Sequence, residues 1–330
     1  MSIREETEKL EREYFSPYAA FSDSSKGRDR EEPPCDIRTI YQRDRDRILH
    51  SKSFRRLKHK TQVFLSPRGD HYRTRLTHTL EVSQLARTIA KALRLNEDLV
   101  DAIALGHDLG HTPFGHAGER ALNAVCPLGF AHYEQSIRVV ELLEKKGEGL
   151  NLTWEVRDGI RNHRTSGSPS TLEGRIVRYC DKIAYIDDAE RAGILKEEEI
   201  PLEFRQVMGF STRERLNTLI HDVIRNSQGR DTIALSPGME QQMHNLRKFM
   251  FVHVYHNPLA KTEEGKAVEL IQRLYEYEKH VELLPQEYID LIEKKGEQTE
   301  RVICDYISGM TDQYSVEKFS ELFVPKSWQR

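Results

Sequence analysis

Apolar residues recur at spacings of three and four along most of this chain of 330 residues, which is the periodicity of an α-helix that buries one face. The clearest stretch covers residues 74–93. There, four apolar residues follow His78 on one face: Val82, Leu85, Ile89 and Leu93. We find no convincing run of alternating β-branched residues between turns, the usual sign of strands. The sequence therefore predicts an all-α fold, with His78 at the head of a buried helical stripe.

The same periodicity sets the predicted organisation. Asn96 is a good N-cap for a helix that carries His107 on its apolar face, and Gly110 is a natural stop for that helix. Other helices are predicted over residues 2–14, 41–60, 119 onward, 171–195, 240–255, 263–277, 285–310 and 316–323. We expect three regions: an N-terminal helix and loop over 1–40, a core over 41–200, and a helical C-terminal region packed on the core over 201–330.

Composition limits the class of protein. A content of 38% hydrophobic and 31% charged residues suits a charge-rich globular protein. The net charge of -3 argues neither for nor against nucleic-acid binding, so any attraction for phosphates must come from local basic clusters. The four cysteines are widely separated, which predicts reduced thiols in a cytoplasmic protein. No stretch resembles a signal peptide or approaches the roughly 20 apolar residues of a membrane span, so no membrane partner is expected.

A histidine next to an aspartate, His107–Asp108, supplies a nitrogen and an oxygen ligand on consecutive residues. The pair alone is common, but His78 upstream and Asp181 downstream also lie on helix faces predicted to point inward. Together the four predict one divalent-metal site that leaves positions for water and substrate. Two imidazoles and two carboxylates suit Mn, Mg, Fe, Ni or Zn alike. A single histidine on an apolar face is more often structural, so this prediction depends on the four residues together.

Further charged groups follow the pair. The spacing of His116 and Glu119 lets the carboxylate orient the imidazole as a general acid or base. Equally, Glu119 could merely stabilise the N-terminus of its helix by interacting with the helix dipole. Arg75 lies one turn before His78 and could hold a phosphate beside the metal. The rest of the basic run over 43–75 suits a solvated helix face as well as a phosphate site. From residue type alone, His132 and His163 are interpreted as structural.

These strings resemble the HD-domain deoxynucleoside triphosphate triphosphohydrolases, the bacterial deoxyguanosinetriphosphatase-like family. Residues 43–51, 54–57 and 60–64 resemble the family's leading segment, and residues 74–82 and 106–119 resemble its catalytic core. The resemblance covers most of the chain. It implies an HD-domain helical bundle with additional C-terminal helices, the central region being a metal-dependent phosphohydrolase core.

The resemblance also implies roles for individual residues. The metal ligands would be His78, His107, Asp108 and Asp181, with His116 as the catalytic histidine and Glu119 as its acidic partner. Gln62 would read the 3′-hydroxyl of a deoxyribose. The remaining substrate contacts would be made by Arg75, His111, His132, Lys182 and Tyr185. The sequence does not decide whether His116 acts as an acid, a base or a transient nucleophile.

One departure from the family pattern follows Ile186. Relatives continue Ile-Ala-Tyr-Ile with Asn-His-Asp-Ile before Asp-Asp-Ala, whereas here Ile186 is followed directly by Asp187. About four residues, near one helical turn, are missing, which removes a His–Asp pair and shifts the downstream chain by about 6 Å. Asp181 precedes this gap, so we expect metal binding to survive, while substrate positioning and turnover are affected.

The predicted function is metal-dependent hydrolysis of dNTPs to deoxynucleoside and inorganic triphosphate, with dGTP as one candidate for the preferred substrate. One alternative is another HD-type nucleotide phosphohydrolase or phosphodiesterase, which would release orthophosphate or pyrophosphate. A second alternative is a weakly active regulator that binds nucleotides or single-stranded DNA. The resemblance further implies a homo-oligomer and an activating dNTP as partners to be tested.

Overall fold

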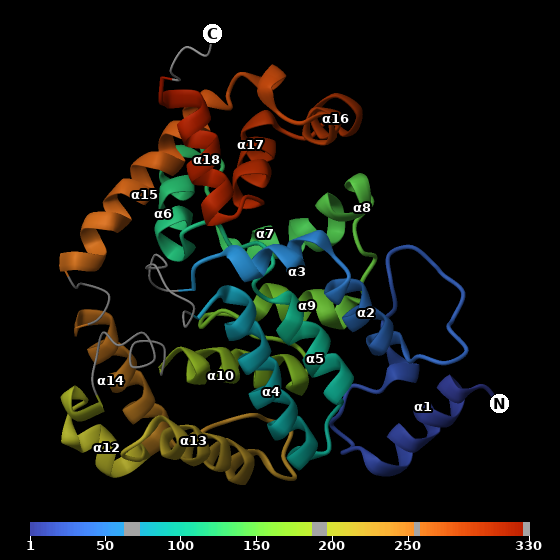
Figure 1. The fold of residues 1–330 in the computed structure, drawn as a ribbon. Coiled ribbons are helices and arrows are strands. Elements are labelled where there is room, and N and C mark those ends of the chain that lie inside the picture. The colour runs from blue at the N-terminus through green and yellow to red at the C-terminus, as the bar shows by residue number, and fades with distance from the viewer. Residues whose placement is uncertain (63–72, 187–196, 254–257, 326–330) are drawn as a thin grey trace.

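The computed structural model describes residues 1–62, 73–186, 197–253 and 258–325, and within them every extended regular element is a helix (Figure 1). The β-type pairings among these residues are the isolated bridges Arg28–Thr153 and Thr61–Thr74. The predicted all-α class is therefore confirmed. None of the described helices combines the length and the apolar composition that crossing a membrane requires. The four cysteines are free.

The N-terminal third begins with α1 (Ile3–Tyr14), which Ser2 and Glu5 cap reciprocally. The helix predicted over 41–60 is instead divided into α2 (Ile40–Leu49), α3 (Lys52–Arg56) and a 3₁₀ turn over Leu57–His59. The division falls at Ser51, whose hydroxyl accepts the Phe54 N–H and so begins a new helix. The prediction of one continuous helix was wrong because a local N-cap interrupts it.

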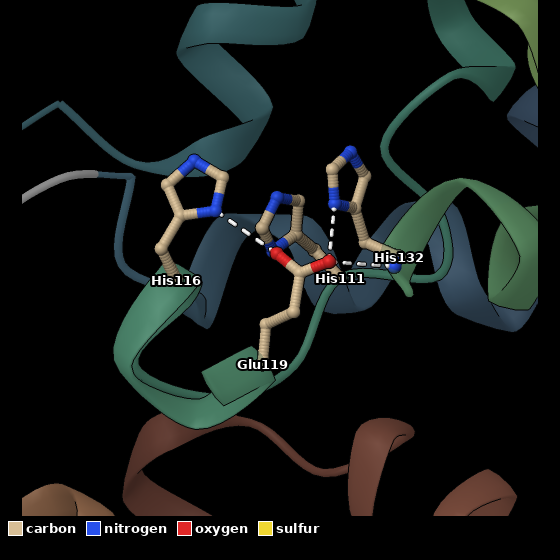
Figure 2. A group of neighbouring side chains, drawn as sticks. All are labelled: His111, His116, Glu119 and His132. Carbon is tan, nitrogen blue, oxygen red and sulfur yellow. Dashed lines mark hydrogen bonds and ion pairs between the residues drawn. The ribbon is translucent and has the colours of Figure 1, made fainter. Parts of the chain in front are cut away.

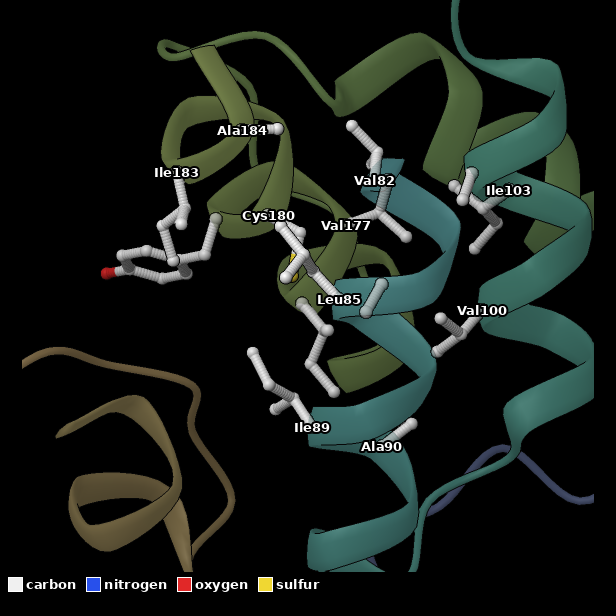
Figure 3. Packing of buried hydrophobic residues seen from close by; sticks show 14 of the residues in the cluster. Val82, Leu85, Ile89, Ala90, Val100, Ile103, Val177, Cys180, Ile183 and Ala184 are labelled. Carbon is white, nitrogen blue, oxygen red and sulfur yellow. The ribbon is translucent and has the colours of Figure 1, made fainter. Parts of the chain in front are cut away.

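Four helices form the centre of the molecule: α4 (Arg75–Leu93), α5 (Glu97–Gly106), α9 (Trp154–Asn162) and α10 (Leu172–Ile186). Helix α4 packs on α5 and α10, and α9 packs on α5 and α10. Figure 3 shows side chains of α4, α5 and α10 meeting in one buried layer, among them Val82, Ile103 and Val177, which are fully buried. Burying each such side chain contributes about 1.5–3 kcal/mol. This layer fixes the relative positions of α4, α5 and α10.

The observed ends of the central helices can be compared with the boundaries predicted from the sequence. Asn96 does cap α5 through its side-chain oxygen, which accepts the N–H groups of Asp98 and Leu99. Helix α5 ends at Gly106 rather than at Gly110, and the following residues form a turn. Of the helix predicted over 171–195, the part up to Ile186 is present as α10, and residues 187–195 lie outside the described residues.

The segment between α5 and α9 holds α6 (Gly115–Val125), α7 (His132–Arg138) and the short α8 (Glu144–Gly147). The C-terminal part holds α12 (Leu202–Met208), α13 (Thr212–Ser227), α14 (Pro237–His253), α15 (Pro258–Tyr277), α16 (Gln286–Lys295), α17 (Thr299–Ser308) and α18 (Asp312–Phe323). The helix predicted over 285–310 is thus two helices. Gly296, at φ 71°, ends the first in the left-handed conformation that glycine adopts without steric cost.

Buried apolar side chains form two clusters. The larger cluster joins the central helices to α2 and to α12–α14, so it extends past residue 200 through side chains such as Phe204 and Met243. The smaller cluster joins α6 to α15, α16 and α17 through side chains such as Leu122, Ile271 and Val302. Figure 1 shows α6 and α15–α18 together at one end of the molecule. The loop between α5 and α6 therefore connects the two clusters.

Two charged side chains, the buried Lys60 and the partly buried Asp312, fasten this loop to the C-terminal helices. Asp312, at the start of α18, accepts the N–H of Phe114 at 2.9 Å and the N–H of Thr61 at 3.0 Å. The ammonium of Lys60 donates to the carbonyls of His111 and Ser308 at 2.5 and 2.6 Å. Phe114 adopts a left-handed conformation (φ 61°), which is costly for an aromatic residue. The Asp312 carboxylate thus stabilises a strained turn.

We predict that Asp312→Ala lowers the free energy of unfolding by about 1–3 kcal/mol, because it leaves buried N–H groups without an acceptor. Urea denaturation of the purified protein measures this change. The matched control is Gln313→Ala at the exposed neighbouring position, where we expect a change within about 0.5 kcal/mol. Equal stability of the two variants would contradict the role given to Asp312.

Candidate metal and phosphate site

The first two predicted ligands come from helices that pack against each other. His78 lies one turn into α4, Asp181 lies in α10, and the His78 Nε2 is 3.0 Å from the Asp181 Oδ1. His78 is 1% exposed, and this burial lowers the pKa of its imidazole. Burial would raise the pKa of Asp181, but the hydrogen bond with His78 and the charge of His107 hold it below the ordinary value. The carboxylate is therefore ionised at neutral pH.

The other two predicted ligands lie in the turn after α5. His107 follows the last helical residue, and its Nδ1 donates to the Ala104 carbonyl at 2.7 Å. Its Nε2 is consequently the nitrogen with a lone pair, and this atom lies 3.4 Å from the Asp108 Oδ2 and 3.9 Å from the Asp181 Oδ1. Among the described residues, the buried Nε2 has no hydrogen-bond partner.

These separations fit ligands of a single divalent ion. Metal–ligand bonds of about 2.1 Å at right angles place neighbouring ligand atoms about 3 Å apart. One ligand atom from each of His78, His107 and Asp108 lies within 4.8 Å of the others, and Asp181 approaches both histidines. The unpartnered His107 Nε2 is the atom that a metal would satisfy. The four residues could therefore hold the predicted ion.

Arg75 lies in the first turn of α4 and is 2% exposed. Its guanidinium donates to the Asp108 Oδ2 at 2.6 Å and to the carbonyls of Thr61 and Gln62 at 3.3 and 3.0 Å. Burial alone would raise the pKa of Asp108, but the charges of His107 and Arg75 hold it well below its ordinary value. Arg75 thus adds positive charge directly beside the four candidate ligands.

A second group of side chains centres on Glu119 in α6 (Figure 2). One carboxylate oxygen of Glu119 lies 3.0 Å from the His116 Nδ1, and the other lies 2.8 Å from the His132 Nδ1 and 2.9 Å from the His132 backbone nitrogen. Burial would raise the pKa of Glu119, but the bonds with His116 and His132 lower it below the ordinary range. Burial would lower the pKa of His132, but its bond with Glu119 raises it.

His111 links the two groups. Its ring stacks on that of His132 with a centroid distance of 4.3 Å and an interplanar angle of 13°. Its Nε2 lies 4.0 Å from the Asp108 Oδ1. Burial, then the positive charge of Arg75, holds the pKa of His111 well below its ordinary value, so the ring is neutral. The predicted catalytic pair and the predicted metal ligands are therefore neighbours in space.

The remaining predicted substrate contacts surround this region. Gln62 is buried, and its side-chain oxygen has no hydrogen-bond partner among the described residues. Lys182 follows Asp181, and burial together with the charges of Arg178 and Arg247 lowers its pKa to about 8. Tyr185 lies one turn after Asp181 on the same helix and is partly exposed. The departure from the family pattern after Ile186 lies outside the described residues.

His163 was interpreted as structural from the sequence, but it lies among the site histidines. Its ring centroid is 5.1 Å from that of His107 and 5.5 Å from that of His132. Its Nδ1 donates to the Ile160 carbonyl at 2.6 Å, as His107 does to Ala104. Burial, then the charges of His107 and His132, lowers its pKa to about 4. Both histidines directly follow the last residue of a helix, but no sequence pattern near His163 indicates which residues its ring will approach.

Gly110 holds the turn after α5 close to α7. The Ser136 hydroxyl donates to the His107 carbonyl at 2.8 Å and accepts the Gly110 N–H at 2.9 Å. A Cβ on Gly110 would lie 2.1 Å from the Ser136 nitrogen and 2.6 Å from the His132 carbonyl oxygen. Glycine is needed here for close approach of two backbones rather than to end a helix.

We predict that Gly110→Ala destabilises the protein by about 1–3 kcal/mol, because backbone atoms rather than flexible side chains must move. Thermal unfolding measures the effect. The control is Gly265→Ala, in the exposed middle of α15, where a Cβ meets nothing within 4 Å. That change should stabilise the helix by about 0.5–1 kcal/mol. Unfolding of both variants at the same temperature would contradict the packing described here.

Comparison with known proteins identifies the family of the chain. The HD domain family matches residues 75–186, and the phosphohydrolase-associated domain family matches residues 233–321. A deoxyguanosinetriphosphate triphosphohydrolase-like protein of Caldanaerobacter subterraneus subsp. tengcongensis is 56% identical over 333 residues, which cover 99% of this chain and 98% of the relative. A protein of the same description from Clostridium perfringens (strain SM101 / Type A) is 49% identical, with 99% of both chains covered.

A solved structure also resembles this fold. The crystal structure of a hypothetical protein from Aquifex aeolicus matches with a TM-score of 0.51, covering 86% of this chain and 68% of that chain. The sequence identity is 20%, so this likeness concerns the fold alone.

Proposed function

We propose that this protein, which belongs to the deoxyguanosinetriphosphate triphosphohydrolase-like family of HD-domain proteins, hydrolyses dNTPs to deoxynucleoside and inorganic triphosphate. The observation that carries the proposal is the approach of His78, His107, Asp108 and Asp181 in a buried site beside the His116–Glu119 pair. This proposal includes the metal ligands, the catalytic pair and the preferred nucleobase of the substrate. For the last of these, dGTP is one candidate substrate.

The two histidines and two aspartates would hold a divalent ion. When bound, such an ion supplies positive charge to phosphate oxygens and makes coordinated water more acidic. Imidazole nitrogens favour Mn, Fe, Ni or Zn, while the carboxylates also accommodate Mg. Asp108 and Asp181 would offset the charge of the ion, and the hydrogen bond from the His107 Nδ1 to the Ala104 carbonyl would present the His107 Nε2 to the metal.

The positive groups around these ligands would hold the triphosphate. Arg75 is already oriented by Asp108 and by two backbone carbonyls, so little side-chain entropy would be lost when it contacts a phosphate. Lys182 and the neutral ring of His111 would contact other phosphate oxygens, with His132 behind His111. Gln62, with its free side-chain oxygen, would accept a hydrogen bond from the sugar 3′-hydroxyl, and Tyr185 would pack against the sugar.

His116 would supply the proton to the departing 5′-oxygen. Its side chain is 47% exposed, so a substrate can reach it, while Glu119 holds its Nδ1 at 3.0 Å. The Nε2 is thus directed away from Glu119, and the carboxylate would stabilise the imidazolium that donates the proton. The bond that breaks joins this oxygen to the α-phosphorus, and the oxygen of water takes its place.

Four further proposals come from the sequence: activation by a dNTP, binding of single-stranded DNA, assembly into a homo-oligomer and a cytoplasmic location. Incubation with each of the four dNTPs, with and without a second dNTP, tests the reaction and the activator together when products are separated by anion-exchange chromatography. Deoxynucleoside plus triphosphate is the expected result. Orthophosphate or pyrophosphate would contradict the proposed reaction and favour another phosphohydrolase activity.

We predict that His116→Ala lowers dNTP turnover at least a hundredfold, the usual contribution of a general acid, while the metal content stays unchanged. His116 lies outside the four ligands proposed for this ion, so loss of that ion would not explain the effect. Release of triphosphate and metal content per chain are the two measurements. The control His221→Ala removes an exposed histidine of α13 and should leave both unchanged. Full turnover by the His116 variant would rule out this role.

A further inference from the structure

We infer that Lys60 is a positioning residue of the site: its buried ammonium fixes the backbone of His111, and its own backbone fixes Arg75, so that both side chains can hold a phosphate. Lys60 is 3% exposed, and we assign it no contact with the substrate. This inference rests on the proposed function, which gives His111 and Arg75 to the triphosphate. The sequence placed Lys60 only within the basic run over 43–75.

The ammonium of Lys60 joins the turn after α5 to the end of α17. It donates to the His111 carbonyl at 2.5 Å and to the Ser308 carbonyl at 2.6 Å. Ser308 is the last residue of α17, where carbonyls have no helical N–H to accept and the helix dipole favours a positive charge. Hydrogen bonds from an ionised donor are roughly twice as strong as neutral ones. The end of α17 therefore serves as an anchor for the His111 backbone.

Both backbone groups of His111 are fixed in this way. Its N–H donates to the Asp108 carbonyl at 3.1 Å, while its carbonyl accepts from Lys60. Its ring stacks on that of His132 and lies 5.1 Å, centroid to centroid, from that of His116 (Figure 2). Loss of the Lys60 contact would free the carbonyl side of His111 and let its ring move relative to both neighbours.

Lys60 also begins a run of three carbonyls that hold Arg75. The Lys60 carbonyl accepts the Arg75 backbone N–H at 3.0 Å. The carbonyls of Thr61 and Gln62 accept the Arg75 guanidinium at 3.3 and 3.0 Å. Because the Lys60 side chain ties this run to α17, one buried lysine sets the positions of both phosphate-binding groups.

The charge of Lys60 is the part of this arrangement that pH can change. Burial, then the charge of Arg56, lowers the pKa of the ammonium to about 7, while the charge of Asp312 opposes this lowering. The ammonium is therefore the main form below this pH, and the neutral amine replaces it as the pH rises. The contact with His111 should weaken accordingly. The charged groups around Lys60 are Arg56 on α3, Arg75 on α4, Asp108 in the turn after α5, Asp305 on α17 and Asp312 on α18.

The test is the affinity of the full chain for inorganic triphosphate, measured by calorimetry at pH 6 and at pH 8. Lys60→Met keeps the apolar stem and removes the ammonium. We expect it to bind triphosphate about tenfold more weakly than the wild type at pH 6, because displaced groups no longer meet the phosphates together. Its affinity should also change less than that of the wild type between the two pH values, since the group that titrates is gone.

Lys60→Arg separates the charge from the shape of lysine. A cavity of about 220 Å³, lined among others by Arg56, Leu109 and Ser308, lies beside Lys60 and has room for the larger side chain. A guanidinium keeps its charge at both pH values. This variant should bind as tightly as the wild type at pH 6 and lose less affinity at pH 8. The control is Lys91→Met, which changes an exposed lysine in the last turn of α4 and should bind like the wild type.

The outcomes separate this inference from the proposed function. Wild-type affinity in Lys60→Met at pH 6 would overturn the inference. So would weak binding by both Lys60 variants with the pH dependence of the wild type, since this indicates a general loss of packing. Thermal unfolding shows whether Lys60→Met is folded. If it is not, the wild type is compared with Lys60→Arg, and an equal loss of affinity between pH 6 and pH 8 would contradict the role of the ammonium. No binding by the wild type would contradict the proposed phosphate site itself, and this inference with it.

Discussion

The buried carboxylate of Asp108 is the constraint on which the surrounding structure depends. A charge with so little access to water must be compensated by groups held nearby, since an unpaired buried charge costs several kcal/mol. Arg75 supplies one such group from α4, while His107 and His111 lie on either side of Asp108 in the same turn. Each of these groups can also bind a metal or a phosphate, so the compensation of one carboxylate assembles the elements of a hydrolytic site.

The two hydrophobic clusters give that arrangement its rigidity. The larger cluster locks α4, α5 and α10 together and so sets the distance between His78 and Asp181. The smaller cluster carries α6, which presents His116 and Glu119, and it joins α6 to the C-terminal helices. Asp312 and Lys60 bind the intervening loop to those helices. The C-terminal region therefore takes part in positioning the site, although the described candidate residues all precede it.

The sequence was sufficient for the features that local chemistry determines. Helical periodicity predicted the all-α fold, and Asn96 was correctly identified as a helix cap. His78 is buried, as the periodicity of its helix predicts, and the partly exposed Asp181 lies on the side of α10 that meets His78. The predicted roles of these residues stay predictions, since position alone does not establish ligation.

Features that depend on distant parts of the chain were missed. Ser51 begins a new helix where periodicity continues, and Gly110 is required by the approach of α7 rather than by its own conformation. His163 enters the site only because α9 packs against α5, α7 and α10, which no spacing near it reveals.

The central claim is that water attacks the α-phosphorus at this site. Hydrolysis of a dNTP in water labelled with a heavy oxygen isotope tests it most directly: the label should appear in triphosphate, and label in orthophosphate, pyrophosphate or the deoxynucleoside would contradict the account.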